Sequence, residues 1–296
     1  MLKQKEVKSV LNKHKKRDSW FLDDYSVNPY EGCACNCLYC YVRGSKYGEN
    51  MEDGLTIKSN AAAILDKQLA ARARKGQYGI IAVGSATDAY MHHEKTLGHT
   101  RTLLEIIARH RFPVFIGTKC TLITRDFDIL AEIDRQAILP DDLRNTLKRG
   151  VIMTISVSTM DETVSNMLEP GAATPTERMQ VLCSMKEAGF LAGVNAMPLL
   201  PGISDTVEAI EQIVSAARAH GADFIFPAGL TLFGNGPSDS KTLYYRFLEK
   251  YKPSLLPAYR RNFDQTSYPS FQYQQELKKR TDAICRRYQL RNTILP

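Results

Sequence analysis

The sequence predicts an α/β fold, a partial (β/α)6 TIM-type barrel with a mainly helical C-terminal extension. From residue 57 onward, apolar strand-like runs alternate with amphipathic helical stretches, which is the pattern of a parallel sheet whose strands are joined by helices. With a first strand added near residue 25, the alternation gives six βα-type units, fewer than the eight of a full barrel. We therefore expect an open or partial barrel.

The expected strands are short apolar runs bounded by turn residues. In chain order they are Tyr25–Pro29, Tyr78–Val83, Pro113–Thr118, Val151–Val157, Leu191–Ala196 and Asp223–Ala228. In parallel α/β folds the loops after the carboxyl ends of the strands form the functional site. Residues that directly follow these runs are therefore the candidates for function.

The expected helices lie between the strands. They are Asn60–Lys75, Gly98–Arg109, Arg125–Ile133, Thr174–Ala188 and Asp205–His220, with a further short helix at Leu139–Arg149. Thr174 and Asp205 are suitable N-cap residues, and Gly189 and Gly221 are suitable C-terminal stops.

Two regions are expected to divide the chain. Residues 1–233 would form the barrel with a basic N-terminal segment, and residues 234–296 a helical appendage packed on the barrel. The division rests on a change of character after Phe233, where Gly234, Gly236 and Pro237 lead into helices rich in Tyr, Lys and Arg.

The composition is that of a soluble globular protein, with 296 residues of which 44% are hydrophobic and 24% charged. The basic first eighteen residues lack the hydrophobic centre of a secretory signal, and no run is apolar enough to cross a bilayer. Seven cysteines, four of them within eight positions, indicate a reducing compartment rather than disulfides. We expect a cytoplasmic protein without membrane contact.

The formal net charge of +7 and the pI near 9.0 favour anionic partners. Basic residues cluster in 13–17 and in 278–291. Nucleic acid is one partner that this charge suits, and simple solvation of basic terminal helices is the alternative.

The cysteine-rich segment 33–40 follows the first expected strand. Its thiolates suit an iron-sulfur cluster or zinc, but a structural zinc site normally joins two separated cysteine pairs, and Cys120, Cys183 and Cys285 stand alone. The spacing Cys33-x3-Cys37-x2-Cys40 supplies three ligands to a 4Fe-4S cluster and leaves one iron open for another ligand. Cys35 leaves a closed four-thiolate electron-transfer cluster as an alternative.

This spacing, with Tyr39 before the last cysteine, resembles the signature of the radical S-adenosylmethionine (SAM) superfamily. The stretch Asn28–Cys33, the segment Cys40–Arg43, and further pieces resemble the subfamily of spore photoproduct lyase-like proteins, also called DNA repair photolyase-like. Those pieces are Gly84–Tyr90 with Glu94, Thr118-Lys119, Ser156–Thr159, Leu168–Pro170 and Pro198–Gly202. The resemblance covers about residues 26–230 and implies an enzyme that cleaves SAM to a 5'-deoxyadenosyl radical and abstracts hydrogen from a substrate.

The resemblance also suggests roles for residues after the strands. Lys119 would reach the SAM carboxylate, Gly84, Ser85 and Thr87 would lie near the methionine amino group, and Ser156 or Ser158 would meet the ribose hydroxyls. We expect only one of Ser156 and Ser158 to face the barrel interior. A tight turn, a packed serine and a lysine at the barrel rim are the structural alternatives.

The final hydrogen donor departs from the lyase pattern. Spore photoproduct lyases use a cysteine that we align with Ser85, and an O-H bond is too strong for serine to replace it. Cys120, Tyr39 and Tyr41 are the remaining candidates for this step, with a buried packing role as the alternative for Cys120.

A second metal site at His92, His93, Glu94 and His99 is disfavoured, because these residues lack the helical i, i+4 spacing of metal-binding histidines. We expect a polar loop on the substrate side.

The leading expectation is thus a radical SAM enzyme with a 4Fe-4S cluster and SAM, acting on a DNA lesion. A peptide or small-metabolite substrate is the first alternative, and a non-catalytic Fe-S or zinc protein the second. The expected partners are SAM, nucleic acid and an electron donor such as flavodoxin or ferredoxin.

Overall fold

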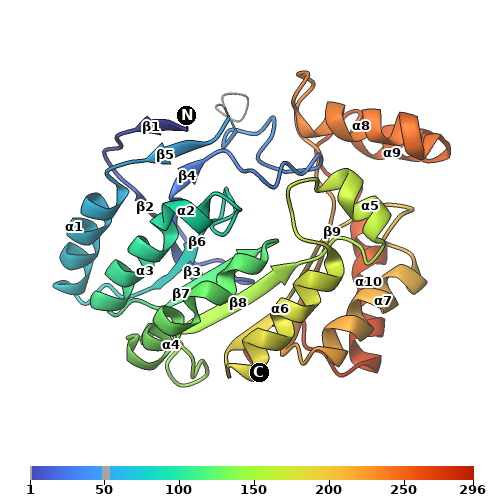
Figure 1. The fold of residues 1–296 in the computed structure, drawn as a ribbon. Coiled ribbons are helices and arrows are strands. Elements are labelled where there is room, and N and C mark those ends of the chain that lie inside the picture. Colours follow the sequence, from blue (N-terminus) through green and yellow to red (C-terminus); the bar gives the residue numbers. More distant parts are fainter. Residues whose placement is uncertain (1, 49–53) are drawn as a thin grey trace.

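Six parallel strands form the wall of an open barrel, as the sequence predicts (Figure 1). The computed structural model describes residues 2–48 and 54–296. The barrel strands are β3 (Asp23–Val27), β6 (Ile80–Val83), β7 (Val114–Thr118), β8 (Val151–Ser156), β9 (Leu191–Leu199) and β10 (Phe224–Gly229). They pair in the order β10-β9-β8-β7-β6-β3, each neighbouring pair parallel. Since β3 and β10 are not paired with each other, the barrel has an open side.

The expected helices cover the outside of this wall (Figure 1). They are α1 (Ala61–Ala73), α3 (His99–Arg109), α4 (Phe127–Gln136), α6 (Pro175–Glu187) and α7 (Val207–Ala219). Thr174 caps α6 in a capping box with Glu177, as its residue type predicts. Gly189 and Gly221 follow α6 and α7 with φ values of +82° and +81°, which side chains rarely adopt.

Two local predictions are wrong. The N-cap of α7 is Thr206, because the Asp205 carboxylate instead accepts from the backbone of Gly202 at 2.6 Å and from the hydroxyl of Tyr273 at 2.7 Å. Segment 139–149 contains turns rather than a helix. Its Leu143 and Leu147 are buried at one end of the barrel. A helix this short would form few hydrogen bonds to offset the free-energy cost of its first turn.

Several short elements were not predicted. Strand β2 (Leu11–Lys13) pairs antiparallel with β3, and a small sheet joins β1 (Lys3–Lys5), β5 (Thr56–Lys58) and β4 (Tyr30–Glu31). Helices α2 (Glu94–Leu97) and α5 (Glu162–Leu168) lie in the loops that follow β6 and β8. Elements of two to seven residues are too short for a clear hydrophobic period.

Apolar side chains fill the end of the barrel at which the strands begin. Phe21 contacts Phe115 and Phe226 with ring centroids 4.8 Å and 5.8 Å apart, and Leu143 and Ile294 belong to the same cluster. This packing closes that end of the barrel, so a site in the interior would open at the other end, where the strands finish.

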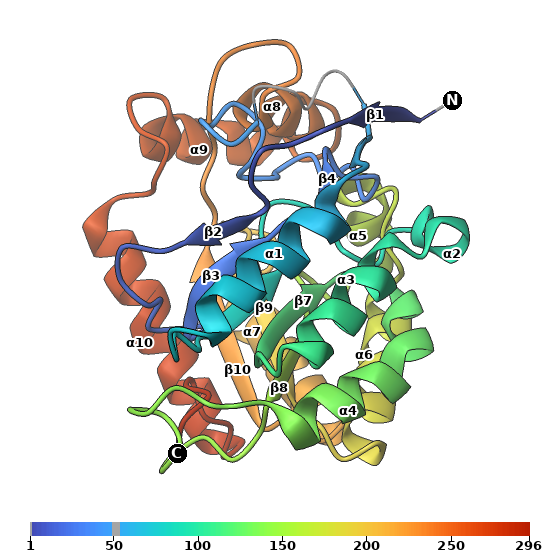
Figure 2. The ribbon, with the colours of Figure 1, turned by 90° about the vertical axis from the view of Figure 1, so that its left-hand side faces the viewer.

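The predicted C-terminal appendage contains α8 (Ser240–Tyr251), α9 (Leu256–Phe263) and α10 (Phe271–Arg287). Helix α10 packs against β10 and α7, as Figure 2 shows from the side. It thereby covers the last barrel strand, and the backbone of Arg291 bridges to Phe224 of that strand. The division of the chain at residue 233 stays a prediction.

Candidate active site

The cysteine loop, residues 32–40, follows β4 and is held by the turn after β6. Gly32 begins it with a φ of +80°, and its carbonyl accepts from the Thr87 hydroxyl at 2.6 Å. The backbone N-H of Asp88 donates to the Cys33 sulfur at 3.4 Å. The Thr87 side chain therefore supports the cysteine loop through this hydrogen bond and does not face open space.

A second support comes from the loop after α5. The backbone N-H of Leu38 donates to the Leu168 carbonyl at 2.9 Å, and that of Gly171 donates to the Cys35 carbonyl at 3.1 Å. A Cβ atom on Gly171 would stand 1.9 Å from the carbonyl oxygen of Ala34. Only glycine permits this approach, so residues 168–171 fix the path of the cysteine loop.

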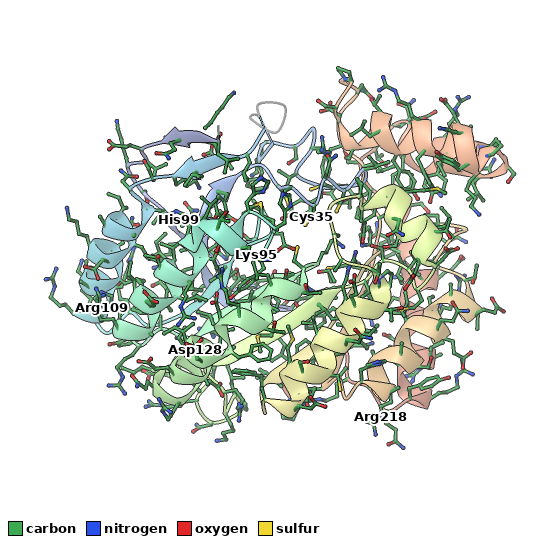
Figure 3. The ribbon with its side chains drawn as sticks, viewed as in Figure 1. Cys35, Lys95, His99, Arg109, Asp128 and Arg218 are labelled. Carbon is green, nitrogen blue, oxygen red and sulfur yellow. The ribbon has the colours of Figure 1, made fainter. Side chains whose placement is uncertain are left out.

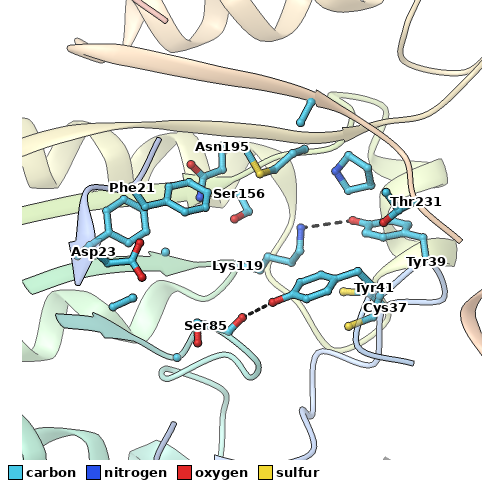
Figure 4. A pocket seen from close by; sticks show the side chains of 18 of the residues that line it. Phe21, Asp23, Cys37, Tyr39, Tyr41, Ser85, Lys119, Ser156, Asn195 and Thr231 are labelled. Carbon is cyan, nitrogen blue, oxygen red and sulfur yellow. Dashed lines mark hydrogen bonds between the residues drawn. The ribbon is translucent and has the colours of Figure 1, made fainter. Parts of the chain in front are cut away.

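A cavity of about 390 Å³ extends from the cysteine loop into the barrel. Figure 4 shows Cys37, Tyr39 and Tyr41 at one end and Phe21 and Asp23 at the other, with Lys119, Ser156 and Asn195 between them. This volume falls in the range of small-molecule sites, and most of the lining is apolar.

Eight of the twelve predicted site residues line this cavity: Cys37, Tyr39, Cys40, Tyr41, Gly84, Ser85, Lys119 and Ser156. The other four, Cys33, Thr87, Cys120 and Ser158, are not part of the lining. Ser156 lines the interior and Ser158 does not. Residues two apart in one strand would share a face, but β8 ends at Ser156 and Ser158 lies beyond it. The hydroxyl of Ser158 is buried, and it donates to Glu169 at 2.6 Å.

Lys119 belongs to a buried charge network. Its Nζ lies 3.0 Å from Oε1 of Glu169 and donates to the Tyr39 hydroxyl at 3.3 Å, and Arg178 pairs with the other oxygen of Glu169. Burial lowers the pKa of Lys119, and Arg178 acts in the same direction. Burial raises the pKa of Glu169 while Arg178 opposes that rise. Two cations thus share one carboxylate, and one of them borders the cavity.

Cys35 does not line the cavity. Its sulfur lies 3.6 Å from that of Cys120, and both thiols lie near the Asp88 carboxylate. That carboxylate already accepts from Tyr90 N-H, Thr118 hydroxyl and Lys119 N-H at 2.7 to 2.8 Å. Figure 3 labels Cys35 in the upper middle of the molecule and Arg218 at its lower edge. Because Cys120 does not reach the cavity, its predicted hydrogen transfer has no geometric support here.

Some polar and aromatic cavity residues were not predicted from the sequence. Phe21 lies just before β3, Asp23 begins it, and Asn195 lies within β9, so none of the three follows the end of a strand. The amide nitrogen of Asn195 donates to Thr154 at 2.9 Å, while its buried amide oxygen has no partner. In the sequence, a polar residue at position 195 within an otherwise apolar strand is the feature that could have identified Asn195 as a site residue.

The His92–His99 segment forms helix α2 and the start of α3. Its one carboxylate, Glu94, is buried and accepts from the Thr100 backbone at 2.7 Å and from Arg125 at 3.3 Å. His99 contacts the Lys58 carbonyl at 3.1 Å. These contacts support a structural role for Glu94.

Comparison with known proteins assigns this arrangement to a class. The family model described as "Radical SAM superfamily" matches residues 27–217, and the chain belongs to that superfamily. Its cofactors are a 4Fe-4S cluster and SAM.

The fold is that of spore photoproduct lyase. A structure of that lyase complexed with dinucleoside spore photoproduct aligns with a TM-score of 0.66 and 13% identity, covering 96% of this chain and 78% of that chain. A variant with bound AdoMet and the same dinucleoside aligns with a TM-score of 0.65, 13% identity and coverage of 94% and 78%. At this identity the match establishes the fold.

Relatives in sequence are uncharacterised. A Mycobacterium tuberculosis protein is 26% identical over 272 residues, which is 90% of this chain and 75% of that protein. A protein of Acidianus two-tailed virus is 25% identical over 215 residues, 69% of this chain and 66% of its own length.

Across the described residues, the helices are too short or too polar to cross a membrane.

The residues present fit the two cofactors. All seven cysteines are free thiols, and Cys37 and Cys40 border the same cavity as Lys119. Burial raises the pKa of Cys37, and the Lys119 ammonium acts against that rise. Soft thiolates close to a buried cation suit an iron-sulfur cluster, whose binding deprotonates its ligands.

Proposed function

We propose that this chain is a radical SAM enzyme acting on a nucleic-acid lesion, with Cys33, Cys37 and Cys40 as the three cluster ligands. The observation that carries the proposal is the shared cavity, onto which Cys37, Cys40, Lys119 and Ser156 all open. When bound, the reduced cluster and SAM together supply the 5'-deoxyadenosyl radical.

The protein's own part is binding and orientation. Lys119 would bind the SAM carboxylate; in support, it is a buried cation at the cavity wall whose partner Glu169 is also held by Arg178. Ser156 is the serine available to a ribose hydroxyl. Gly84 and Ser85 line the wall near the cysteine loop, where the methionine amino group would lie, and Thr87 positions that loop through Gly32.

The far end of the cavity would receive the substrate group. Phe21 and Phe115 supply apolar ring surface, and the Asp23 carboxylate and the free amide oxygen of Asn195 supply acceptors. These groups suit a planar heterocycle that carries N-H donors, such as a nucleobase. A base in a strand would have to leave its stack to enter.

Tyr41 and Tyr39 are the side chains proposed for the final hydrogen transfer. Both line the cavity, and the Tyr41 hydroxyl contacts the Ser85 carbonyl across it. The electron would come from a small donor such as flavodoxin or ferredoxin in a reducing cytoplasm.

The test uses anaerobically reconstituted, reduced protein with SAM. Dinucleoside spore photoproduct is compared with the undamaged dinucleotide, and 5'-deoxyadenosine is quantified by chromatography. The proposal expects faster SAM cleavage and loss of the lesion with the damaged substrate. Equal slow cleavage with both, and no salt-sensitive binding of DNA, would redirect the search to peptides or small metabolites.

A further inference from the structure

A groove of about 550 Å³ runs along the open side of the barrel, outside the cavity. Strand β10 forms its floor, the start of α10 forms one side, and Trp20 lies at its edge. The groove and the cavity share Ala228, Gly229 and Thr231 in their linings. A chain lying in the groove could therefore extend one unit into the cavity.

Three large aromatic side chains in this groove are exposed. Trp20, Tyr268 and Phe271 have exposed fractions of 43%, 55% and 76%; Trp20 precedes β3, and the other two lie at and just before the start of α10. Trp20 is held in place, since its ring stacks on Phe226 with centroids 5.5 Å apart. Tyr268 packs edge-on against Phe233 at 5.8 Å. Ordered aromatic faces left open to water mark a binding surface.

The polar residues around these rings favour a nucleic-acid strand. Helix α10 carries five basic and two acidic residues, and Lys278, Gln274 and Gln275 line the groove with the aromatics. Among the described residues, Lys278 is the one basic residue in the groove lining, and it pairs at 2.6 Å with Asp282, the one acidic residue there; the other four basic residues of α10 lie outside the lining. Stacking rings and amides on a helix with a surplus of basic residues are elements by which proteins bind single strands without reading sequence.

We propose that this groove binds the nucleotides next to the reacting base, with bases stacked on Trp20, Tyr268 and Phe271. The inference rests on the proposed nucleic-acid substrate and adds the route by which the strand reaches the cavity. It assigns α10 a direct part in substrate binding.

Trp20 is the only tryptophan of the chain, so its fluorescence reports on the groove directly. Reconstituted protein is titrated with labelled single-stranded oligothymidylate, and anisotropy of the label is followed together with Trp20 emission. We expect Trp20 quenching that follows the anisotropy curve. Phe271→Ala should weaken binding roughly ten-fold, the value of losing one stacked base.

Tyr251→Ala is the matched control, because Tyr251 is an exposed aromatic of α8 outside the groove lining. Circular dichroism checks that both variants are folded. Binding by anisotropy without Trp20 quenching, or equal effects of the two variants, would overturn the groove and leave the nucleic-acid function intact. No binding at low salt would overturn both, while SAM cleavage measured separately would still stand.

Discussion

The backbone N-H of Gly171 donates to the carbonyl oxygen of Cys35 across 3.1 Å, joining the loop after α5 to the cysteine loop. Three residues before Gly171 lies the end of α5, whose Leu168 carbonyl accepts from Leu38. The proposed cluster ligands are thus positioned by a segment more than one hundred residues away in sequence.

Gly171→Ala should displace the cysteine loop, because the new methyl group would meet the Ala34 carbonyl at 1.9 Å. We expect cluster retention to weaken about ten-fold, as for other residues that orient metal ligands. Iron content after reconstitution and desalting measures it. Gly76→Ala is the control: its Cβ would meet nothing within 4 Å, and the backbone strain of an alanine at its φ of +62° is confined to the turn after α1, so iron should be retained.

Lys119→Met should lower SAM affinity about ten-fold, since a charge-assisted hydrogen bond to the carboxylate is lost. Equilibrium dialysis with labelled SAM on the reconstituted protein gives the dissociation constant. Lys148→Met, which removes an exposed lysine, should leave it unchanged. Unaltered binding in Lys119→Met would remove Lys119 from the site.

Glu169→Ala leaves Lys119 and Arg178 buried without their shared carboxylate. Breaking a buried ion pair from one side costs about 3–5 kcal/mol, and urea unfolding should show a loss of that size. Glu162→Ala on the exposed face of α5 should change the free energy of unfolding by less than about 0.5 kcal/mol. A similar small change at both positions would contradict the network.

Asp23 predicts a pH dependence. Burial raises the pKa of its carboxyl above 3.8, and His14 only partly opposes this. The folded state therefore holds this proton more tightly than the unfolded state, so the stabilisation is present below pH 3.8 and is lost as pH rises through the folded pKa.

Asp23→Asn keeps the shape and cannot ionise. The stability of this variant relative to wild type should therefore rise across that pH window, as measured by urea unfolding at a series of pH values. A stability difference that does not change with pH would show that Asp23 is not the titrating group.

The strands and helices of the barrel could be predicted because their hydrophobic patterns extend over many residues. Residues such as Thr174, a helix cap, and Gly189, a helix stop, also mark where helices begin and end. The prediction that Asp205 caps a helix was wrong because its carboxylate accepts a hydrogen bond from Tyr273, which lies far away in the sequence. The cysteine spacing marked Cys37 and Cys40, but no local pattern marks Gly171, whose role depends on a backbone approach between distant loops. Thr87 and Ser158 have the expected hydroxyl groups, but these donate to the Gly32 carbonyl and the Glu169 carboxylate in the structure around the cavity and do not line it.

The central claim is that Cys33, Cys37 and Cys40 hold a cluster that cleaves SAM, with Cys35 outside the ligand set. The most direct measurement is 5'-deoxyadenosine formation from SAM by the reconstituted, reduced protein, comparing wild type with Cys37→Ala and Cys35→Ala. We predict product from wild type and Cys35→Ala and none from Cys37→Ala. A fully loaded wild-type cluster that forms no 5'-deoxyadenosine, or loss of the cluster in Cys35→Ala, would contradict the account and favour a four-thiolate electron carrier.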